Sequence, residues 1–432
     1  MNLTNKKVAV LGAGRSGQAA ARLALHHGAN VCIFDSSDAV TNIPEGVNFI
    51  GGATETDGHE YAADLVVISP GIEANCPFTR SFLDCAEELI GELELACRFY
   101  SGKIIAITGT NGKTTTTALL EKILLNAGKK AVACGNFGVP VSELLLRDEI
   151  PEILALEASS FQLETVKQFH ADIAIWLNFA PDHMDRYTSV EDYYNDKLHI
   201  FDNQTSDDYA IIRVGETLPL LRARVETFSS VESFGTLSYS DGQINEGHQP
   251  LLDLRGTTMA QSHNAENVMA ALLACRALGV STEIVAETLR DFSPPGHRCE
   301  VVKILDGVTW MNDSKSTNLH STEAALRSQT TKVVLIIGGK DKGLDYAPLK
   351  PLLAEKVRAC IVFGQIKDQL FDVFAPVVPS SKLDDVEGCV NAARDLARPG
   401  DVVLFSPGTS SFDMFTGYVQ RGQVFRDAVE KL

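Results

Sequence analysis

The sequence lacks three features that would each place a protein in a recognisable class. No apolar run reaches the ~18 residues that a membrane-spanning helix needs, and the N-terminus lacks a signal-peptide pattern. The nine cysteines include no Cys-x-x-Cys pair, which argues against a zinc ribbon and against a disulfide scaffold. We therefore expect a soluble, cytoplasmic protein that does not insert into a membrane.

Positive charge is also scarce. The 432 residues include 38 Lys and Arg against 56 Asp and Glu, which gives a formal net charge of −18. Sequence-independent nucleic-acid binding needs a basic surface, so we expect no nucleic-acid partner. Hydrophobic residues make up 45% and charged residues 22%, so the chain is not a disordered one. At ~150 residues per domain, its length suggests about three domains.

Short apolar runs that are typical of buried strands alternate with stretches of helical periodicity. The runs are Lys7–Leu11, Leu65–Ile68, Ile104–Ile107, Ile153–Leu156, Ile173–Leu177, Val333–Ile337, Cys360–Phe363 and Val402–Phe405. Helical periodicity marks Gln18–His27, Thr115–Ala127 and Asn264–Leu278. This alternation predicts an α/β fold with parallel sheets covered on both faces. Ligands of such sheets bind beyond the carboxyl ends of the strands, so we expect the chemistry in the loops there.

Two places predict domain boundaries. One lies near Leu93, ahead of the strand that opens a glycine loop, and the other is Ser293-Pro294-Pro295-Gly296, which cannot form regular helix or strand. The polar stretch from about Asp202 to Met259 predicts a β-rich insertion or surface hairpins. The predicted domains are residues 1–93, 94–294 and 295–432.

The strongest local motif is a strand that runs into Gly109-Thr110-Asn111-Gly112-Lys113-Thr114-Thr115. Its glycines would let backbone N–H groups approach phosphate oxygens, and the next helix would direct its positive end at them. Lys113 would lie on the β- and γ-phosphates and the Thr114 hydroxyl on Mg²⁺. Ile107 stands where the usual P-loop has its first glycine, so this loop is a shortened version. The alternative is a tight strand–helix turn that happens to contain lysine.

Another glycine loop, Gly12-Ala13-Gly14-Arg15-Ser16-Gly17, follows the first strand, and Asp35 ends the next strand. Alone, this pattern is typical of a dinucleotide site with Asp35 on a ribose hydroxyl. It does not identify the ligand, because any diphosphate suits a helix N-terminus. A packing turn without a ligand is the alternative. Two anion-binding loops in one chain suggest two phosphate-bearing substrates.

Candidate metal ligands lie between the predicted strands. Glu157 follows one apolar run, and His183 lies in Pro181-Asp182-His183. Carboxylate, imidazole and water suit Mg²⁺ when phosphates supply the remaining oxygens. Taken singly, each residue is better explained without a metal: Glu157 by a salt bridge, His183 by a hydrogen-bonded loop position and Lys197 by an exposed surface position. Towards the C-terminus, cations and hydroxyls follow predicted strands and favour anion recognition, at His297-Arg298, Asn312–Asn318, Lys340, Lys342 and Ser410-Ser411.

Together these loops resemble the Mur ligase family. The resemblance extends in order over essentially the whole chain, at Gly12–Gly17, Ser69–Ile72, Gly109–Thr115, Gly135–Gly138, Glu157–Glu164, Asp182–Tyr187, His263-Asn264, His297-Arg298, Asn312–Asn318 and Ser406–Phe412. Three runs favour the family member that adds D-glutamate: Ser159–Glu164, His183–Tyr187 and Asp313-Ser314-Lys315. The Asp-Asn-Pro-Arg signature expected of the member that adds a dibasic residue is absent.

The resemblance implies an ATP-dependent ligase that activates UDP-N-acetylmuramoyl-L-alanine as an acyl phosphate and joins it to D-glutamate, in peptidoglycan precursor synthesis. It implies an N-terminal Rossmann-like parallel sheet that binds the UDP end. It also implies a central P-loop-type α/β domain for Mg·ATP and a C-terminal Rossmann-like α/β domain for D-glutamate. A monomer is expected. The D-glutamate and ATP groups lie on different domains, so the Pro294-Pro295 segment is the expected hinge of a domain closure.

The resemblance also implies roles for particular residues. The UDP substrate would be bound by Gly14, Arg15, Ser16, Asp35, Ser36, Ser69, Gly71 and Asn136. ATP would be bound by Gly109–Thr115, completed from across the domain boundary by Asn267, Arg298 and Asp313. D-glutamate would be bound by Lys315, Thr317, Lys342, Ser411, Phe412 and Tyr418. Mg²⁺ would be held by Thr114, Glu157, His183 and Lys197, the last as a carbamate formed with CO₂. Lys113, Asn136, His183 and Lys197 would be catalytic. Ser36-Ser37 stands where some relatives place a basic residue beside the uracil.

Three other functions stay open at this point. An NAD-dependent oxidoreductase would use Gly12–Gly17 and Asp35 but would leave the Gly109–Thr115 loop idle. A non-catalytic nucleotide switch would need only that loop. A folate polyglutamylating ligase would share the ATP loop without needing an N-terminal UDP-binding fold.

Overall fold

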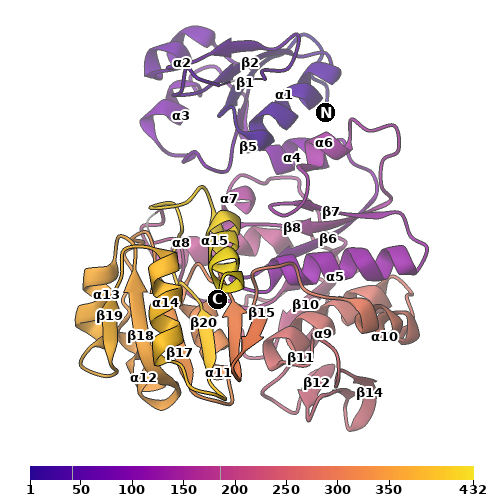
Figure 1. Ribbon diagram of the computed structural model, residues 1–432. Helices are drawn as coiled ribbons and strands as arrows, with labels where there is room; N and C mark the ends of the chain where they lie inside the picture. The colour runs from indigo at the N-terminus through magenta and orange to yellow at the C-terminus, as the bar shows by residue number, and fades with distance from the viewer. Residues whose placement is uncertain (41, 185) are drawn as a thin grey trace. The chain divides into compact units, whose positions relative to one another are not determined.

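The computed structural model describes residues 1–40, 42–184 and 186–432, and contacts among them divide the chain into two units. Unit 1 comprises Met1–Phe179, Glu191–Ala260 and Asn264–Ser293. Unit 2 comprises Ala180–Val190, Gln261–His263 and Pro294–Leu432. The strands of the described residues form three sheets, two in unit 1 and one in unit 2 (Figure 1).

The first sheet of unit 1 is parallel throughout, in the order β3-β2-β1-β4-β5 over the described residues. Its strands are β1 (Lys7–Leu11), β2 (Asn30–Phe34), β3 (Asn48–Ile50), β4 (Leu65–Ile68) and β5 (Glu88–Gly91). Its helices are α1 (Arg15–His26), α2 (Glu55–Tyr61), α3 (Pro77–Ser81) and α4 (Glu92–Cys97). The continuous apolar runs of β1 and β4 are buried because helices or loops cover both faces of a parallel sheet. Both strands have their predicted bounds.

The second sheet of unit 1 has the order β14-β13-β12-β11-β10-β9-β6-β8-β7 over the described residues. Its strands are β6 (Lys103–Thr108), β7 (Ala131–Gly135), β8 (Ile153–Glu157), β9 (Ile173–Trp176), β10 (Tyr209–Arg213), β11 (Arg224–Ser229), β12 (Leu237–Ser240), β13 (Gln243–Glu246) and β14 (Gln249–Asp253). Its helices are α5 (Lys113–Asn126), α6 (Val141–Leu144), α7 (Ser160–Leu163), α8 (Val190–Leu198), η1 (His199–Phe201), α9 (Ser262–Ala277) and α10 (Thr282–Asp291).

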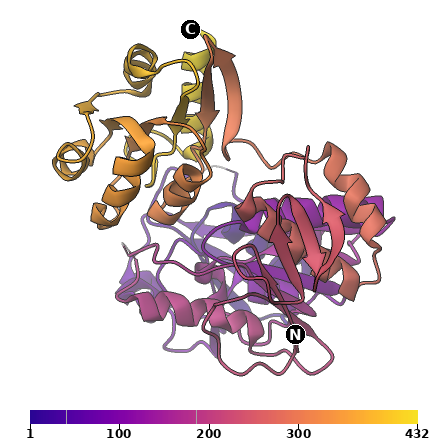
Figure 2. The same ribbon diagram turned by 90° about the horizontal axis from the view of Figure 1, so that it is seen from below.

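The polar segment that predicted hairpins divides into two parts. β12, β13 and β14 pair antiparallel as a meander (pink and salmon strands in Figure 2). β10 and β11 instead extend the parallel sheet beside β9. The sequence reveals the β propensity of this segment, but composition does not distinguish parallel from antiparallel pairing.

The sheet of unit 2 has the order β15-β16-β20-β17-β18-β19 over the described residues, with only β15 antiparallel to its neighbour. Its strands are β15 (Glu300–Leu305), β16 (Val308–Asn312), β17 (Val333–Gly338), β18 (Val357–Phe363), β19 (Ser380–Lys382) and β20 (Val402–Phe405). Its helices are α11 (Leu319–Arg327), η2 (Ala347–Leu349), α12 (Lys350–Lys356), α13 (Lys367–Phe374), α14 (Val386–Leu396) and α15 (Tyr418–Glu430).

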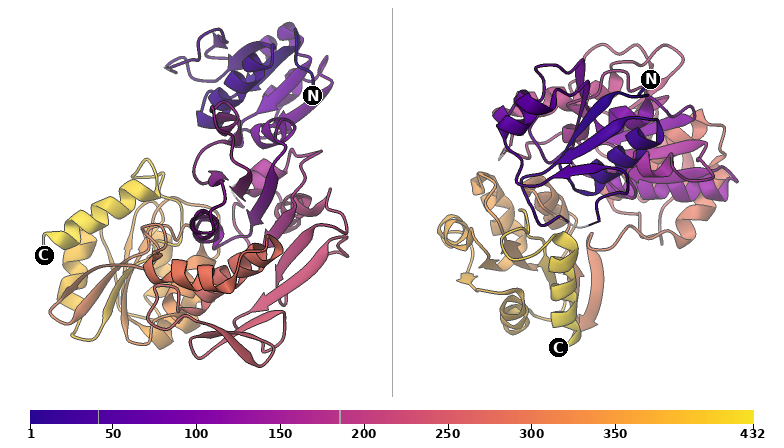
Figure 3. Two further views of the ribbon diagram at one scale, coloured as in Figure 1. Left: turned by 90° about the vertical axis from the view of Figure 1, so that its right-hand side faces the viewer. Right: turned by 90° about the horizontal axis from the view of Figure 1, so that it is seen from above.

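Both faces of the unit 2 sheet are covered, as its apolar strands predict. Helices lie on both sides of this sheet (Figure 3). Leu335 of β17 packs in a core with α11, α12 and α13, whereas its neighbour Val334 packs on the other face with α14 and α15. Alternate residues of one strand therefore serve two cores. The predicted α/β class with three sheet-based domains is confirmed, while the boundaries near residues 93 and 294 stay predictions. Among the described residues, no helix combines the length and apolar character that crossing a bilayer requires.

Candidate active site

A cavity of about 880 Å³ opens at the carboxyl ends of β1, β2 and β4. It is lined by all eight residues that the resemblance assigns to the UDP substrate: Gly14, Arg15, Ser16, Asp35, Ser36, Ser69, Gly71 and Asn136. Apolar side chains such as Phe34, Ile72 and Phe78 complete the wall, together with Thr54 and Glu55 at the start of α2. Ile72 belongs to the predicted motif Ser69–Ile72, but the other wall residues were not foreseen, because nothing in the local sequence separates them from ordinary core and cap positions.

Two glycines of the loop Gly12–Gly17 are packed too closely to be replaced by a larger residue. A Cβ at Gly17 would lie 1.9 Å from the Gly12 carbonyl oxygen, and Gly12 itself has a φ of +94°. The backbone N–H of Ala13 donates to Asp35 Oδ2 at 2.7 Å, and that of Ser37 donates to Oδ1 at 2.9 Å. Asp35 therefore fixes the loop as well as lining the cavity.

The loop Gly109–Thr115 joins β6 to α5, which begins at Lys113, two residues before the predicted helical stretch Thr115–Ala127. The Lys113 ammonium donates to the carbonyl oxygens of Gly109 at 2.7 Å and Thr110 at 2.8 Å. The side chain thus curls over its own loop, at the positive end of the helix. A phosphate at this helix N-terminus would meet both the backbone N–H groups and the lysine.

Two asparagines hold the phosphate loop in place. Asn178, which follows β9, accepts from the N–H of Thr110 at 2.9 Å through its carbonyl and from that of Asn111 at 2.9 Å through Oδ1. We had not assigned Asn178 a role, although its place just beyond a strand next to β6 could have indicated one. Asn267 of α9 accepts from the Thr116 hydroxyl at 3.3 Å, and a Cβ at Gly112 would lie 2.3 Å from its Oδ1.

Asn267 corrects one expectation. It was expected to reach the loop from across a domain boundary, but it lies in unit 1 with the loop. The reason is that α9 returns to pack on the central core, where Ala265, Val268 and Met269 are buried. Arg298 and Asp313, the other two predicted ATP ligands, belong to unit 2.

Glu157 ends β8 and is 2% exposed. Its Oε1 accepts from Asn136 Nδ2 at 2.6 Å, and its backbone carbonyl accepts from the Asn136 N–H at 2.9 Å. Its Oε2 is buried without a hydrogen-bond partner among the described residues. The partner of Glu157 is thus an amide rather than the cation of a salt bridge, and one oxygen is left for a ligand. A buried carboxylate oxygen of this kind suits a cation.

Lys197 lies in α8 and is 1% exposed, so the alternative of a surface lysine is wrong. Its Nζ donates to the Gly109 carbonyl at 3.2 Å and lies 4.7 Å from the centroid of the Tyr193 ring. The amine is therefore beside the first glycine of the phosphate loop. Amphipathic periodicity could not reveal this, because α8 is short and rich in charged residues.

In unit 2, a buried ion pair joins two segments that are distant in sequence. Lys342 Nζ lies 2.5 Å from Asp182 Oδ1, and Asn318 Nδ2 donates to Asp182 Oδ2 at 2.9 Å. Burial opposes ionisation of Asp182, yet the charges of His183 and Lys342 hold its pKa below the usual value. His183 itself has a φ of +60°. Asp185 of the predicted His183–Tyr187 motif lies outside the described residues.

Asp313 directly follows β16 and is 5% exposed. It accepts hydrogen bonds from the hydroxyl groups of Ser316 and Ser406 and from the N–H of Cys299. Burial raises the pKa of Asp313 to about 6, although these hydrogen bonds and the charge of Arg298 act in the opposite direction. Asp313 thus interacts with the charge of Arg298, and both residues are predicted for the ATP site.

The residues predicted for D-glutamate have different surroundings. Lys315 Nζ lies 4.0 Å from the centroid of the Tyr418 ring. The loop that carries Lys315 is held by Arg421, which is fully buried and donates to the Ser314 carbonyl at 2.8 Å and to the Thr409 carbonyl at 3.0 Å. Burial lowers the pKa of Arg421 to about 9. Arg421, in α15, was missed, because a lone arginine carries no local signal in the sequence. Ser411 is buried and Thr317 is half-buried.

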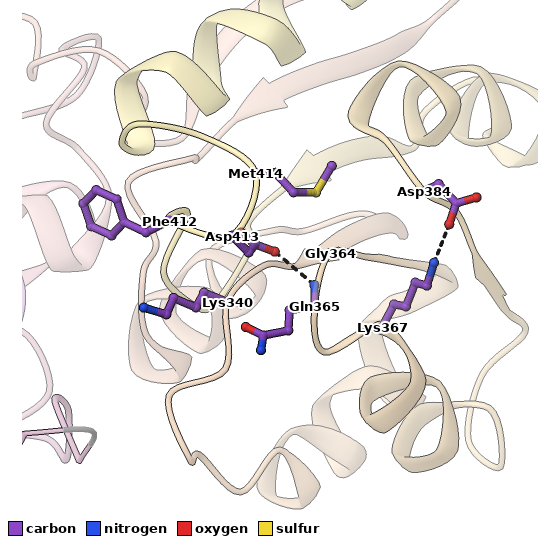
Figure 4. A pocket seen from close by; sticks show the side chains of 8 residues that line it. All are labelled: Lys340, Gly364, Gln365, Lys367, Asp384, Phe412, Asp413 and Met414. Carbon is purple, nitrogen blue, oxygen red and sulfur yellow. Dashed lines mark hydrogen bonds and ion pairs between the residues drawn. The ribbon is translucent and has the colours of Figure 1, made fainter.

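Phe412 is 67% exposed and lines a separate hollow of about 550 Å³ (Figure 4). There Asp413 accepts from the Gln365 N–H at 3.0 Å, and Lys367 pairs with Asp384. Lys340 and Met414 complete the wall. None of the other predicted D-glutamate residues lines this hollow in the described part of the chain.

Over the described ranges, no three His, Cys, Asp or Glu side chains gather to hold a metal. Of the four predicted Mg²⁺ ligands, Thr114, Glu157 and Lys197 belong to unit 1 and His183 to unit 2. A metal in unit 1 would therefore take oxygens from a bound phosphate as well as from protein.

Three family models match the chain. They are the Mur ligase MurD-like N-terminal domain over residues 6–91, the Mur ligase middle domain over 107–275 and the Mur ligase glutamate ligase domain over 297–408. Among similar proteins is a UDP-N-acetylmuramoylalanine–D-glutamate ligase of Acidobacterium capsulatum, 39% identical over 99% of this chain and 97% of that protein. Another, with the same name, is from Geotalea uraniireducens and is 37% identical over 100% of this chain and 99% of that protein.

Solved structures share the fold at lower identity. The MurF ligase of Thermotoga maritima, in complex with ADP, is 18% identical, with a TM-score of 0.63 over 99% of this chain and 96% of that one. The UDP-N-acetylmuramate–alanine ligase MurC of the same organism is 17% identical, with a TM-score of 0.62 over 99% of this chain and all of that one.

Proposed function

The chain belongs to the Mur ligase family, and from this premise we propose that it adds D-glutamate to UDP-N-acetylmuramoyl-L-alanine at the expense of ATP. The observation that carries the proposal is full-length similarity, at 35–39% identity, to relatives named for this reaction. The cavity that gathers the eight predicted UDP-substrate residues supports it. The match of the MurD-like N-terminal model disfavours a folate polyglutamylating ligase.

The reaction needs activation because a carboxylate oxygen is a poor leaving group. An oxygen of the alanyl carboxylate attacks the γ-phosphorus of ATP, and ADP leaves. The amine of D-glutamate then attacks the acyl carbon and loses a proton, and phosphate leaves from the tetrahedral intermediate. Because phosphoryl transfer depends mainly on positioning and charge neutralisation, the chain has to hold the reacting groups in line.

The phosphate loop would hold ATP. Lys113 would exchange its contacts with the Gly109 and Thr110 carbonyls for the β- and γ-phosphates, which are stronger partners for an ammonium. Asn267 keeps the loop in shape through Gly112 and Thr116. Arg298 and Asp313 are the other residues proposed to bind ATP.

Glu157, Thr114, His183 and a modified Lys197 would hold Mg²⁺. The fit rests on Glu157 Oε2, which is buried without a hydrogen-bond partner among the described residues. When bound, Mg²⁺ would neutralise charge on the transferred phosphoryl group. Lys197 would react with CO₂ to give a carbamate, which converts a cation beside Gly109 into an anionic oxygen ligand. Asn136, bonded to Glu157, would orient the acyl group.

D-glutamate carries two carboxylates, which need cations and hydroxyls. Lys315 and Lys342 would supply the cations, and Thr317 and Ser411 the hydroxyls. Lys342 would share its ammonium between Asp182 and a substrate carboxylate. Tyr418 would form a wall through its contact with Lys315, and Phe412 would form another.

Phosphate release from ATP, measured with each substrate omitted in turn, tests the proposal. Release should require UDP-N-acetylmuramoyl-L-alanine, and full turnover should also require D-glutamate. Equal ATP hydrolysis without the muramoyl substrate would disprove it. An NAD-dependent oxidoreductase would instead oxidise or reduce its cofactor, which absorbance reports in the same samples. We further propose that the enzyme is a cytoplasmic monomer. Sedimentation of the purified protein as a dimer would contradict the monomer.

A further inference from the structure

Arg15 links the glycine loop to a segment of the central sheet. It is the first residue of α1, and its side chain lines the UDP cavity. Its Nη1 donates to the Gly138 carbonyl at 2.9 Å, and its Nη2 lies 3.6 Å from Glu143 Oε2. The guanidinium is therefore engaged with the segment 135–143, between β7 and the end of α6, rather than directed only at the cavity.

The same segment carries Asn136, whose position is fixed from its other side. Asn136 is bonded to Glu157 through both its backbone N–H, at 2.9 Å, and its amide, at 2.6 Å. The turn between these anchors is tight, since the Gly135 N–H donates to the Val139 carbonyl at 2.9 Å and Gly138 has a φ of +85°. A Cβ at Gly138 would lie 2.5 Å from the Ala133 carbonyl oxygen, which leaves this turn little freedom.

We propose that Arg15 is a positioning residue that sets the place of Asn136 relative to the UDP cavity. This inference rests on the proposed function. A substrate held by its diphosphate must present its acyl end at Asn136, which lines the same cavity. The Arg15–Gly138 hydrogen bond fixes the spacing between the two, because Gly138 lies two residues from Asn136 in a closed turn. Binding energy gained at the UDP end is thereby used to align the reacting carboxylate.

A positioning role and a diphosphate-binding role for Arg15 predict changes in different quantities. An interaction that serves alignment affects kcat, whereas one that binds UDP equally in all states affects Kd and KM. A misplacement of 1 Å can cost about 10²-fold in rate. Arg15→Met keeps most of the stem but removes the donors. We expect kcat to fall about ten- to a hundredfold, while the Kd of UDP alone changes less than about twofold.

The experiment compares Arg15→Met, Arg15→Lys and the matched control Arg147→Met. Arg147 also faces Glu143, with 4.0 Å between Nη2 and Oε1, but it has no bond to Gly138 and does not line the cavity in the described residues. Arg147→Met should keep both kcat and UDP affinity. Arg15→Lys keeps a donor on a long stem and should recover part of kcat. Titration of UDP by calorimetry and steady-state turnover give the two quantities.

Hydrogen exchange supplies a readout that does not depend on turnover. UDP should slow exchange of the amides of residues 135–144 in the wild type but not in Arg15→Met. A weakened UDP affinity with unchanged kcat would overturn the inference and make Arg15 a diphosphate ligand. The inference would also be overturned if UDP slowed exchange in Arg15→Met as much as in the wild type and kcat were unchanged. If the wild type fails to turn over at all, the proposed function fails, while the exchange result still decides the role of Arg15.

Discussion

Charged groups at the strand ends of the two units are held in different ways. In unit 1, the ammonium groups of Lys113 and Lys197 both donate to the Gly109 carbonyl, at 2.7 and 3.2 Å. In unit 2, Lys342 pairs with the buried carboxylate of Asp182 at 2.5 Å. A phosphate is a stronger partner for an ammonium than a carbonyl is, whereas a substrate carboxylate must compete with Asp182 for Lys342. Gly109 thus offers Lys113 and Lys197 a neutral acceptor, whereas Asp182 offers Lys342 an anionic one.

The largest expected effect concerns Lys197. If its carbamate supplies an oxygen ligand next to Gly109, Lys197→Ala should abolish turnover, and a small carboxylic acid such as acetate should restore part of it. The reason is that an added carboxylate can occupy the space left by the truncated side chain. Phosphate release in the presence of increasing acetate measures the rescue. Lys113→Ala is the matched control, since acetate cannot replace a cation. Rescue of both variants, or normal activity of Lys197→Ala, would contradict the carbamate.

The next effect is the loss of the cation of the phosphate loop. Lys113→Ala removes a charge from a preorganised site, and losing one such contact typically costs ~10²–10³-fold in rate. Affinity for UDP should be unchanged, because the UDP cavity lies at another sheet. Lys122→Ala, an exposed lysine on the same helix α5, serves as control and should keep full turnover. Near-normal turnover of Lys113→Ala in the same assay would make the loop a structural turn.

The sequence predicts the unit 1 loops better than the unit 2 contacts, for a physical reason. A strand, a glycine loop and a helix are local in the chain, so Gly109–Thr115 and Gly12–Gly17 could be located from their own residues. β1 and β4 likewise have their predicted bounds, because buried parallel strands are continuous apolar runs. The pairing of Asp182 with Lys342 joins residues 160 positions apart. Neither residue type nor spacing reveals such a pair.

Some buried groups were out of reach for the same reason. Asn178 and Arg421 each fix a loop that was identified, but each does so from a distant part of the chain. Asn178 accepts hydrogen bonds from backbone N–H groups of one loop, and Arg421 donates to backbone carbonyls of the other. The expectation that Asn267 lies across a domain boundary was wrong, because the return of α9 to the central core depends on packing. The roles of the site residues stay predictions, while the α/β class and family were foreseen from whole motifs.

The smallest expected effect concerns Asp313, a buried carboxylate of unit 2. The pKa of Asp313 is raised by burial from 3.8 to about 6, so the folded protein binds more protons than the unfolded chain between these pH values. The free energy of unfolding should therefore fall as the pH rises from about 4 to about 6, and this loss persists at higher pH. Asp313→Asn cannot ionise, so its melting temperature should fall less than that of the wild type over the same interval. Thermal unfolding at several pH values gives, for each protein, the slope of the melting temperature against pH. The difference between the two slopes removes the contributions of groups that both proteins share. Asp306→Asn, on the exposed turn between β15 and β16, is the control and should keep the wild-type slope. An Asp313→Asn slope equal to the wild-type slope would show that the hydrogen bonds from Ser316, Ser406 and Cys299 fully compensate the burial of this carboxylate.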